Sequence, residues 1–303
     1  MNKVIAHIKR FIVWIAPYAK RLFLMLKTNA WYLLWFFVYY YYTCSFLLPI
    51  FKLNTFIVCL YIYGISLLIA YFLGDIILCW IEGARPIETK REKEYLIPIF
   101  EEVYQDVKDI YPALPKIQLN IIDSLTVNAM AFGNHTIAIT QGAIETFNYE
   151  ELKGVLAHEI SHIYHKDTKA VIMNTIGNGI FTILIVAIKL ILKLFEFIAK
   201  MYKSTVVQAV FNLIRFVFEL WIFVVLWLGK LILSLNSRNN ELKADKFAYE
   251  AGYGEQLIDA LYIIQKMSLG QKMDLVMRIQ ASHPRVSKRI GKLEALVDEE
   301  IAG

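Results

Sequence analysis

Residues 155–162 read Val-Leu-Ala-His-Glu-Ile-Ser-His, and this stretch decides how the rest of the chain is interpreted. On a helix, His158 and His162 are four residues apart and project from one face. Both imidazoles can then reach one Zn²⁺ ion, with Glu159 beside the attacking water as its general base. The alternative is that two histidines flank a glutamate by chance. The spacing favours a metal site.

The residues before this stretch predict that it is helical. Asn148 is a favourable N-cap and Glu151 follows three residues later, which is the arrangement of a capping box. A helix should therefore begin near Tyr149. Apolar residues follow at helical spacing on one side of it, namely Leu152, Val155, Leu156, Ile160 and Ile163.

A catalytic zinc needs a third protein ligand, for which the sequence offers two candidates. His165 is close, but it follows His162 by only three residues and is expected to face solvent. The second candidate is Glu241, in a helix predicted over residues 237–252, where Asp245 shares its face and could accept the free ring N–H of a ligand histidine. Spacing alone leaves open whether this face binds metal or is an ordinary solvated acidic surface.

The composition indicates a membrane protein. Of 303 residues 57% are apolar, and the mean hydropathy is +0.47. Soluble domains are about 45–50% apolar, so purely soluble, disordered and fibrous chains are excluded. The net charge of +5 arises in residues 1–28, which hold basic residues and no acid, so a nucleic-acid-binding surface is not expected. The three cysteines lie in the apolar N-terminal region and form no metal motif.

Four hydrophobic stretches could form helices in the membrane. Ala30–Phe51 and the run from Leu53 to Ile81, uncharged as far as Gly74, predict a transmembrane hairpin. By the positive-inside rule, the N-terminal arm and the basic cluster at 85–93 lie in the cytoplasm. Residues 1–29 form a basic amphipathic arm at the inner membrane surface rather than a cleaved signal peptide.

The other two stretches, Ala170–Ile188 and Val206–Leu235, are less uniform. Four lysines separate them, and Arg215 and Glu219 interrupt the later one. Two arrangements remain open: a hairpin that crosses the membrane, which is favoured, or a shallow re-entrant pair that does not cross.

The polar segments 82–169 and 236–303 together have the size of one domain. The first segment predicts a helix from about Glu88 to Ile110, a strand at 116–123 and two short strands within 127–140 around a Gly133–Asn134 turn. The rest reads as helical. The domain is therefore expected to be α+β with a small sheet.

Four motifs occur in one order: NAMAFG at 128–133, VLAHEISH at 155–162, SRNNELKAD at 237–245 and HPRVSKRI at 283–290. Together with the hydrophobic stretches, they resemble the HtpX-like membrane zinc metallopeptidases, relatives of the CaaX prenyl proteases. The resemblance runs from about residue 82 to 295. The basic arm and the lysine-rich segment depart from the family pattern.

The resemblance implies roles for particular residues. Glu241 would be the third ligand of one Zn²⁺ per chain, and Asp245 would be the partner of a ligand histidine. Asn128, Ala129, Met130 and Ala131 would form an edge strand that pairs with an extended substrate. His283 would donate a hydrogen bond to the reaction's oxyanion; without the resemblance, its position before a helix favours an ordinary capping or surface histidine.

The expected fold is an α+β membrane protein. A mostly helical, gluzincin-like domain at 82–303 has a small sheet and is interrupted by a hydrophobic hairpin at 170–235. With the hairpin at 30–81, four hydrophobic helices result, two N-terminal and two inserted between the metal-ligand helices. This architecture implies a multi-pass protein of the inner or plasma membrane in contact with lipid.

The expected function is that of a zinc endopeptidase with a cytoplasmic active site. Its substrates would be unfolded or misfolded membrane proteins, as in protein quality control and stress response; its oligomeric state is left open. Two alternatives are a CaaX-type prenyl protease and a non-catalytic scaffold with a structural zinc. Charged residues flank the 158–162 motif on both sides, which argues against an intramembrane protease.

Overall fold

The computed structural model describes residues 54–201, 205–268 and 284–302, together with positions 34, 37, 38, 41 and 45. The chain divides into two units, 1–61 and 62–303. The described part of the first unit is a few helical positions and the beginning of helix α3 (Thr55–Ile81). The predicted basic arm and most of the hydrophobic run Ala30–Phe51 therefore lie outside the described residues.

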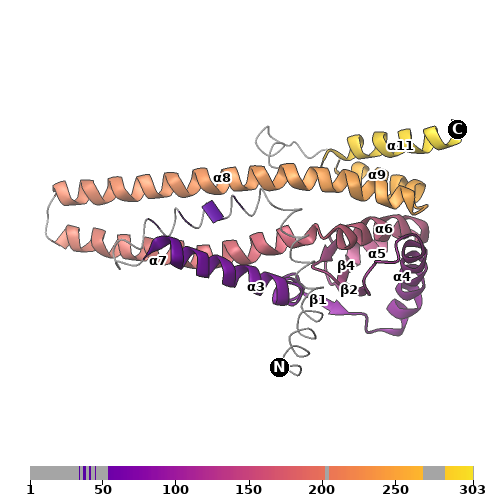
Figure 1. Ribbon diagram of the computed structural model, residues 1–303, viewed down its shortest axis with the longest axis horizontal. Helices are drawn as coiled ribbons and strands as arrows, with labels where there is room; N and C mark the ends of the chain where they lie inside the picture. Colours follow the sequence, from indigo (N-terminus) through magenta and orange to yellow (C-terminus); the bar gives the residue numbers. More distant parts are fainter. Residues whose placement is uncertain are drawn as a thin grey trace, which may run out of the picture. The chain divides into compact units, whose positions relative to one another are not determined.

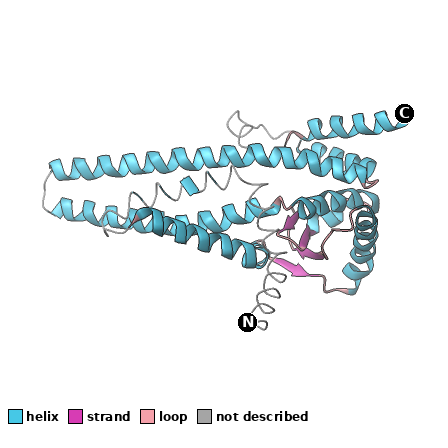
Figure 2. Cartoon of the chain, in the orientation of Figure 1, coloured by secondary structure: helices cyan, strands magenta, loops and turns pink. Residues whose placement is uncertain are grey.

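Helices make up most of the described chain, and the strands gather in one small mixed sheet (Figure 2). The strand order is β1-β2-β4-β3, with β1 at Ala84–Pro86, β2 at Gln118–Ile122, β3 at Ala129–Phe132 and β4 at Thr136–Thr140. Strands β2 and β4 are parallel, and the outer pairs are antiparallel. The strand predicted at 116–123 and the two within 127–140 are confirmed.

Two helices of the domain begin with capping boxes, of which the one at Asn148 was predicted. Helix α4 (Lys90–Ile110) starts after Thr89, whose hydroxyl accepts the Glu92 N–H while the Glu92 carboxylate accepts the Thr89 N–H. Helix α6 (Tyr149–His165) starts after Asn148 with the same reciprocal bonds to Glu151. Helix α5 (Gln141–Thr146) joins β4 to α6. The core lies between these helices and the sheet, with fully buried side chains that include Ile99, Val103, Ile137, Ile139, Leu156 and Ile160.

A long helical hairpin follows α6 (Figure 1). Helix α7 (Thr168–Met201) begins directly after the metal-motif helix, and α8 (Thr205–Glu250) returns beside it. Large apolar side chains are exposed in the first half of α8, from Val206 to Trp227, for example Phe216 at 62% and Phe223 at 67%. Such a surface suits contact with lipid.

Helix α8 continues past the point where its hydrophobic stretch was predicted to end. The sequence predicts a boundary at Leu235 and a separate helix at 237–252, but α8 has no break there. Residues 231–250 contain no proline or glycine, so nothing interrupts the backbone hydrogen bonds when the side chains change from apolar to polar. The predicted stop at Gly252 is confirmed, because α8 ends at Glu250 and Gly252 has a φ of +85°.

Two more helices pack on the metal-motif region. Helix α9 (Gly254–Ser268) contacts α6 and α8, and α11 (Val286–Ala302) contacts α9 and α8. Helix α11 lies in the part of the domain that the sequence predicts to be helical, and its apolar residues Ile290 and Leu293 are buried.

The turn between β3 and β4 is tied to helix α3. The Asn134 backbone N–H donates to the Asp75 carboxylate at 2.9 Å. Gly133 has a φ of +56°, and a Cβ at this position would overlap that carboxylate. The turn therefore requires glycine, and it holds the C-terminal half of α3 beside the sheet.

Among the described residues, one helical segment is long and apolar enough to cross a membrane, Thr205–Leu228 in α8. A second qualifies only if the two parts of α3, Phe56–Ala70 and Phe72–Ile81, which meet at 68°, count as one span. The number of membrane crossings therefore stays a prediction.

Candidate metal centre

Helix α6 brings the three motif side chains together. His158 and Glu159 are buried, with 5% and 8% of their surface exposed. The Nε2 atoms of His158 and His162 lie 3.3 Å apart, and one donor atom each from His158, Glu159 and His162 falls within a 4.8 Å cluster. The predicted one-face arrangement of the two histidines is therefore present.

Helix α8 supplies Glu241, the candidate third ligand beside the two histidines. Glu241 is 4% exposed. Its Oε2 atom lies 3.5 Å from Nε2 of His158, and its Oε1 atom lies 3.6 Å from Nε2 of His162. Donor atoms bound tetrahedrally to zinc at about 2.0–2.1 Å are separated by about 3.3–3.4 Å. Two imidazoles and one carboxylate at these separations fit a zinc site with one position left for water.

Asp245, one helical turn after Glu241, contacts the imidazole of His158. Asp245, 3% exposed, places Oδ1 3.1 Å from Nδ1 of His158. Burial alone would raise the pKa of Asp245, but the hydrogen bond with His158 and the charges of His158 and Arg289 keep it below its ordinary value. The carboxylate therefore stays ionised and accepts the Nδ1–H, which leaves Nε2 for a metal.

Arg289 of helix α11 closes this side of the site. Its guanidinium donates two hydrogen bonds to Asp245, at 2.6 and 2.9 Å, and lies 3.0 Å from Glu241. The side chain is 8% exposed. One buried cation thus compensates two buried carboxylates from the neighbouring helix, in the bidentate geometry that arginine favours.

The second histidine also meets a carboxylate. Nδ1 of His162 lies 3.4 Å from Oδ2 of Asp167, just beyond the end of α6. Burial alone would lower the pKa of His162, but the hydrogen bonds with Asp167 and Glu241, together with the nearby Glu159 charge, raise it to about 10. The carboxylates around this imidazole therefore make the local electrostatic potential negative.

The other ligand candidate, His165, lies apart from these donors. Its Nδ1 is 3.0 Å from the hydroxyl and from the carbonyl oxygen of Ser161. Its ring packs edge-on against Tyr164 and Phe247. His165 is half-buried and packs against these rings, and the described donor cluster does not include it.

Of the remaining predicted site residues, the structure describes those at 128–131 but not His283. Ala129, Met130 and Ala131 lie in β3, an outer strand of the described sheet that also contacts helices α6 and α7. Asn128 precedes β3, where its backbone pairs with Thr140. His283 lies outside the described residues, just before the buried Pro284.

The sequence pattern of peptidase family M48 matches residues 90–297, which is more than half of the chain. The chain belongs to peptidase family M48. The matched M48 segment contains every described residue of the metal centre, and the resemblance to HtpX-like peptidases is confirmed.

Individual M48 relatives match over smaller parts. The chain is 38% identical to a protein named Protease HtpX homolog from Bacteroides fragilis (strain YCH46) over 125 residues, 39% of this chain and 36% of the relative. It is 30% identical to Protease HtpX of Mannheimia succiniciproducens over 198 residues, 60% of this chain and 67% of that relative. The first match thus spans about a third of the relative's length. A crystal structure of S. mikatae Ste24p is 20% identical with a TM-score of 0.46, covering 96% of this chain and 65% of that one.

Two residues contact the candidate ligands without any sequence pattern that assigns them a role. Arg289 stands in HPRVSKRI, and Asp167 is one of the charged residues that flank the motif. Arg289 reaches His158 across 131 positions of sequence, so no local pattern reveals the contact. The signal for Asp167 is weak: an acid directly after the end of the motif helix.

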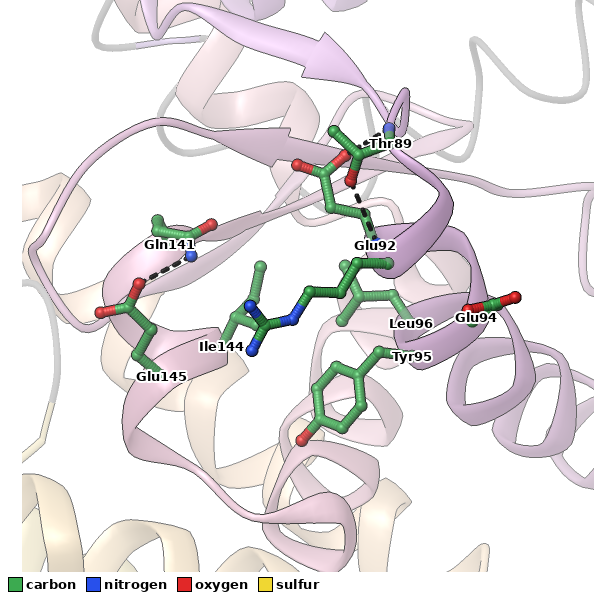
Figure 3. Close-up of a pocket in the computed structure, with 9 residues that line it drawn as sticks. Thr89, Glu92, Glu94, Tyr95, Leu96, Gln141, Ile144 and Glu145 are labelled. Atoms are coloured by element: carbon green, nitrogen blue, oxygen red, sulfur yellow. Dashed lines mark hydrogen bonds between the residues drawn. The ribbon is translucent and has the colours of Figure 1, made fainter.

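A separate surface pocket of about 780 Å³ lies between the starts of α4 and α5 (Figure 3). Two carboxylates of its lining accept hydrogen bonds from other residues of the protein. Glu145 accepts a hydrogen bond from Gln141 at 2.7 Å, and Glu92 completes the capping box with Thr89. The lining contains no residue of the metal centre.

Proposed function

We propose that the chain is a membrane-bound, zinc-dependent endopeptidase. The observation that carries the proposal is the convergence of two histidines and a glutamate from α6 and α8 at separations that suit tetrahedral zinc. Glu159 beside them supports catalysis rather than a structural role, because a structural zinc takes four protein ligands and needs no base.

The mechanism follows from these positions. Zinc held by His158, His162 and Glu241 would supply a Lewis acid that acidifies a water molecule and polarises the scissile carbonyl. Glu159 would take the proton from the attacking water and deliver it to the leaving amine. His283 is the proposed donor to the oxyanion, where one such bond is typically worth about 10²–10³ in turnover.

Strand β3 is the proposed substrate platform. It is an outer strand beside α6, so an extended polypeptide could add to the sheet next to the motif through main-chain hydrogen bonds. Main-chain pairing reads little sequence, which supports broad specificity for unfolded or misfolded membrane proteins.

The proposed topology places the active site in the cytoplasm. Helix α6 and the C-terminal part of α8 meet at the site, so the insertion between them must return to the same side of the membrane. We propose that residues 170–235 cross twice, that residues 30–81 form the N-terminal hairpin, and that the arm 1–29 lies at the inner surface.

Cleavage by the variant Glu159→Gln tests this function. With an unfolded protein substrate in detergent, the wild type should cleave in a zinc-dependent way and the variant should not, because an amide can neither take nor give the proton. Cleavage by the variant at the wild-type rate would contradict the general-base assignment. No cleavage by zinc-loaded wild type would favour the scaffold, and cleavage restricted to prenylated CaaX peptides would favour the prenyl protease.

A further inference from the structure

The junction between α6 and α7 has an unusual backbone. Lys166 ends α6 in the left-handed conformation with a φ of 62°. The next backbone N–H, that of Asp167, then donates to the carbonyl of His162 at 3.1 Å. The chain therefore folds back on the last turn of α6 and brings the Asp167 carboxylate to the imidazole of His162.

This carboxylate is held in place by its surroundings. Asp167 is 8% exposed, and the following Thr168 is 7% exposed. The Thr168 hydroxyl donates to the carbonyl of Gly133 at 2.6 Å, in the turn that Asp75 of α3 also holds. The junction is thus anchored to the β3–β4 turn by the residue that follows Asp167.

The two imidazoles of the metal centre are supported in the same way from different elements. Nδ1 of His158 faces Asp245 of α8 at 3.1 Å, and Nδ1 of His162 faces Asp167 at 3.4 Å. A carboxylate on Nδ1 fixes the ring and keeps the proton there, so that Nε2 presents its lone pair to a metal. Only the first of these carboxylates has a role implied by the family resemblance.

We infer that Asp167 is a positioning residue that orients His162 for zinc. The inference rests on the proposed metal centre and extends it. Residues that support a metal ligand in this way typically contribute 10–100-fold in metal affinity. Asp167→Ala should therefore weaken zinc binding by about that factor. Asp167→Asn keeps an acceptor oxygen without the charge and should lose less.

The experiment measures zinc affinity of the purified full chain in detergent, by competition with a chromophoric chelator. Thr168→Val is the matched control: it removes the neighbouring anchor to Gly133 but keeps the carboxylate on His162. The visible absorption spectrum of the Co²⁺-substituted protein gives a second readout, because it responds to the orientation of a ligand imidazole. The expected order of zinc affinity is wild type and Thr168→Val, then Asp167→Asn, then Asp167→Ala.

Two results would overturn the inference. One is wild-type zinc affinity and an unchanged Co²⁺ spectrum in Asp167→Ala, or in Asp167→Asn if the alanine variant does not fold. The other is an equal loss in Thr168→Val, which would mean that the junction only supports the fold. Undiminished zinc binding in His162→Ala would instead show that the metal centre itself is wrongly assigned, and Asp167 would lose its role with it.

Discussion

At the scale of single residues, the centre balances buried charges with one arginine. Glu241 and Asp245 are 4% and 3% exposed, and Arg289 contacts both. Removing one partner from a buried pair leaves the other charge without compensation, which typically costs more than the pair contributes to stability. Arg289 therefore connects the position of helix α11 to the geometry of the proposed zinc ligands.

Arg289→Ala should lower the free energy of unfolding by roughly 3–5 kcal/mol, because two buried carboxylates lose their cation. Denaturant unfolding of the purified chain in detergent measures this change. Lys288→Ala, an exposed neighbour on the same helix, is the control and should change stability by no more than about 0.5 kcal/mol. Similar small effects of both substitutions would contradict the role given to Arg289.

Some of these residues could be predicted from sequence and others could not. His158, Glu159 and His162 were predictable because helical spacing and a capping box are local properties. Glu241 required the family resemblance, since its spacing to Asp245 fits a solvated face equally well. The contacts of Arg289 depend on how α11 packs on α8, which no local pattern encodes.

At the scale of elements, local sequence patterns predict the approximate starts of α4 and α6. They do not predict that α8 is continuous or that β1 is present. Strand β1 has only three residues, Ala84–Pro86, and a proline ends it, so it lacks any alternating pattern. Arg85 of β1 nevertheless joins two elements, because it bonds Asp123 after β2 and Glu92 in the first turn of α4.

This ion-pair group predicts a pH dependence of stability. The hydrogen bonds from Arg85 and from the Thr89 N–H lower the pKa of Glu92 from 4.5 to about 2. A lowered pKa in the folded state stabilises the protein above the ordinary value, and this contribution is lost as the pH falls through the folded value. The difference in thermal unfolding midpoint between wild type and Glu92→Gln should be constant from pH 7 to about 4.5 and shrink toward pH 2.

The control for this experiment is Glu94→Gln, an exposed residue on the same helix whose ion pair with Lys90 is 3.6 Å long. Its midpoint should stay close to that of the wild type over the whole pH range. A difference for Glu92→Gln that persists unchanged at pH 2 would show that Glu92 acts through something other than its charge.

At the scale of the whole molecule, the proposed membrane topology depends on the insertion at 170–235, which separates the proposed ligands of α6 from Glu241 of α8. Near its tip, Glu196 of α7 pairs with Arg215 of α8 at 2.9 Å and with Lys200 at 2.9 Å. Pairing lowers the cost of charges near or within a bilayer, and long basic side chains can extend toward the interface. These contacts support the proposal that the lysine-rich tip reaches the far side of the membrane.

Cysteine labelling tests that proposal in intact cells. In a background without the native cysteines, Lys200→Cys should react with a membrane-impermeant reagent added from outside, whereas Lys288→Cys should react only after the cells are opened. Lack of labelling at 200 would mean that the hairpin does not cross. Outside labelling at 288 would contradict a cytoplasmic catalytic domain.

The central claim is a catalytic zinc held by His158, His162 and Glu241, and the zinc content of the purified full chain tests it most directly. Mass spectrometry of metals should find one zinc per chain in the wild type and in Glu159→Gln, because the proposal makes Glu159 the general base rather than a ligand. Glu241→Ala and His162→Ala should lose most of their zinc. Full zinc occupancy in Glu241→Ala, or its loss in Glu159→Gln alone, would contradict the account.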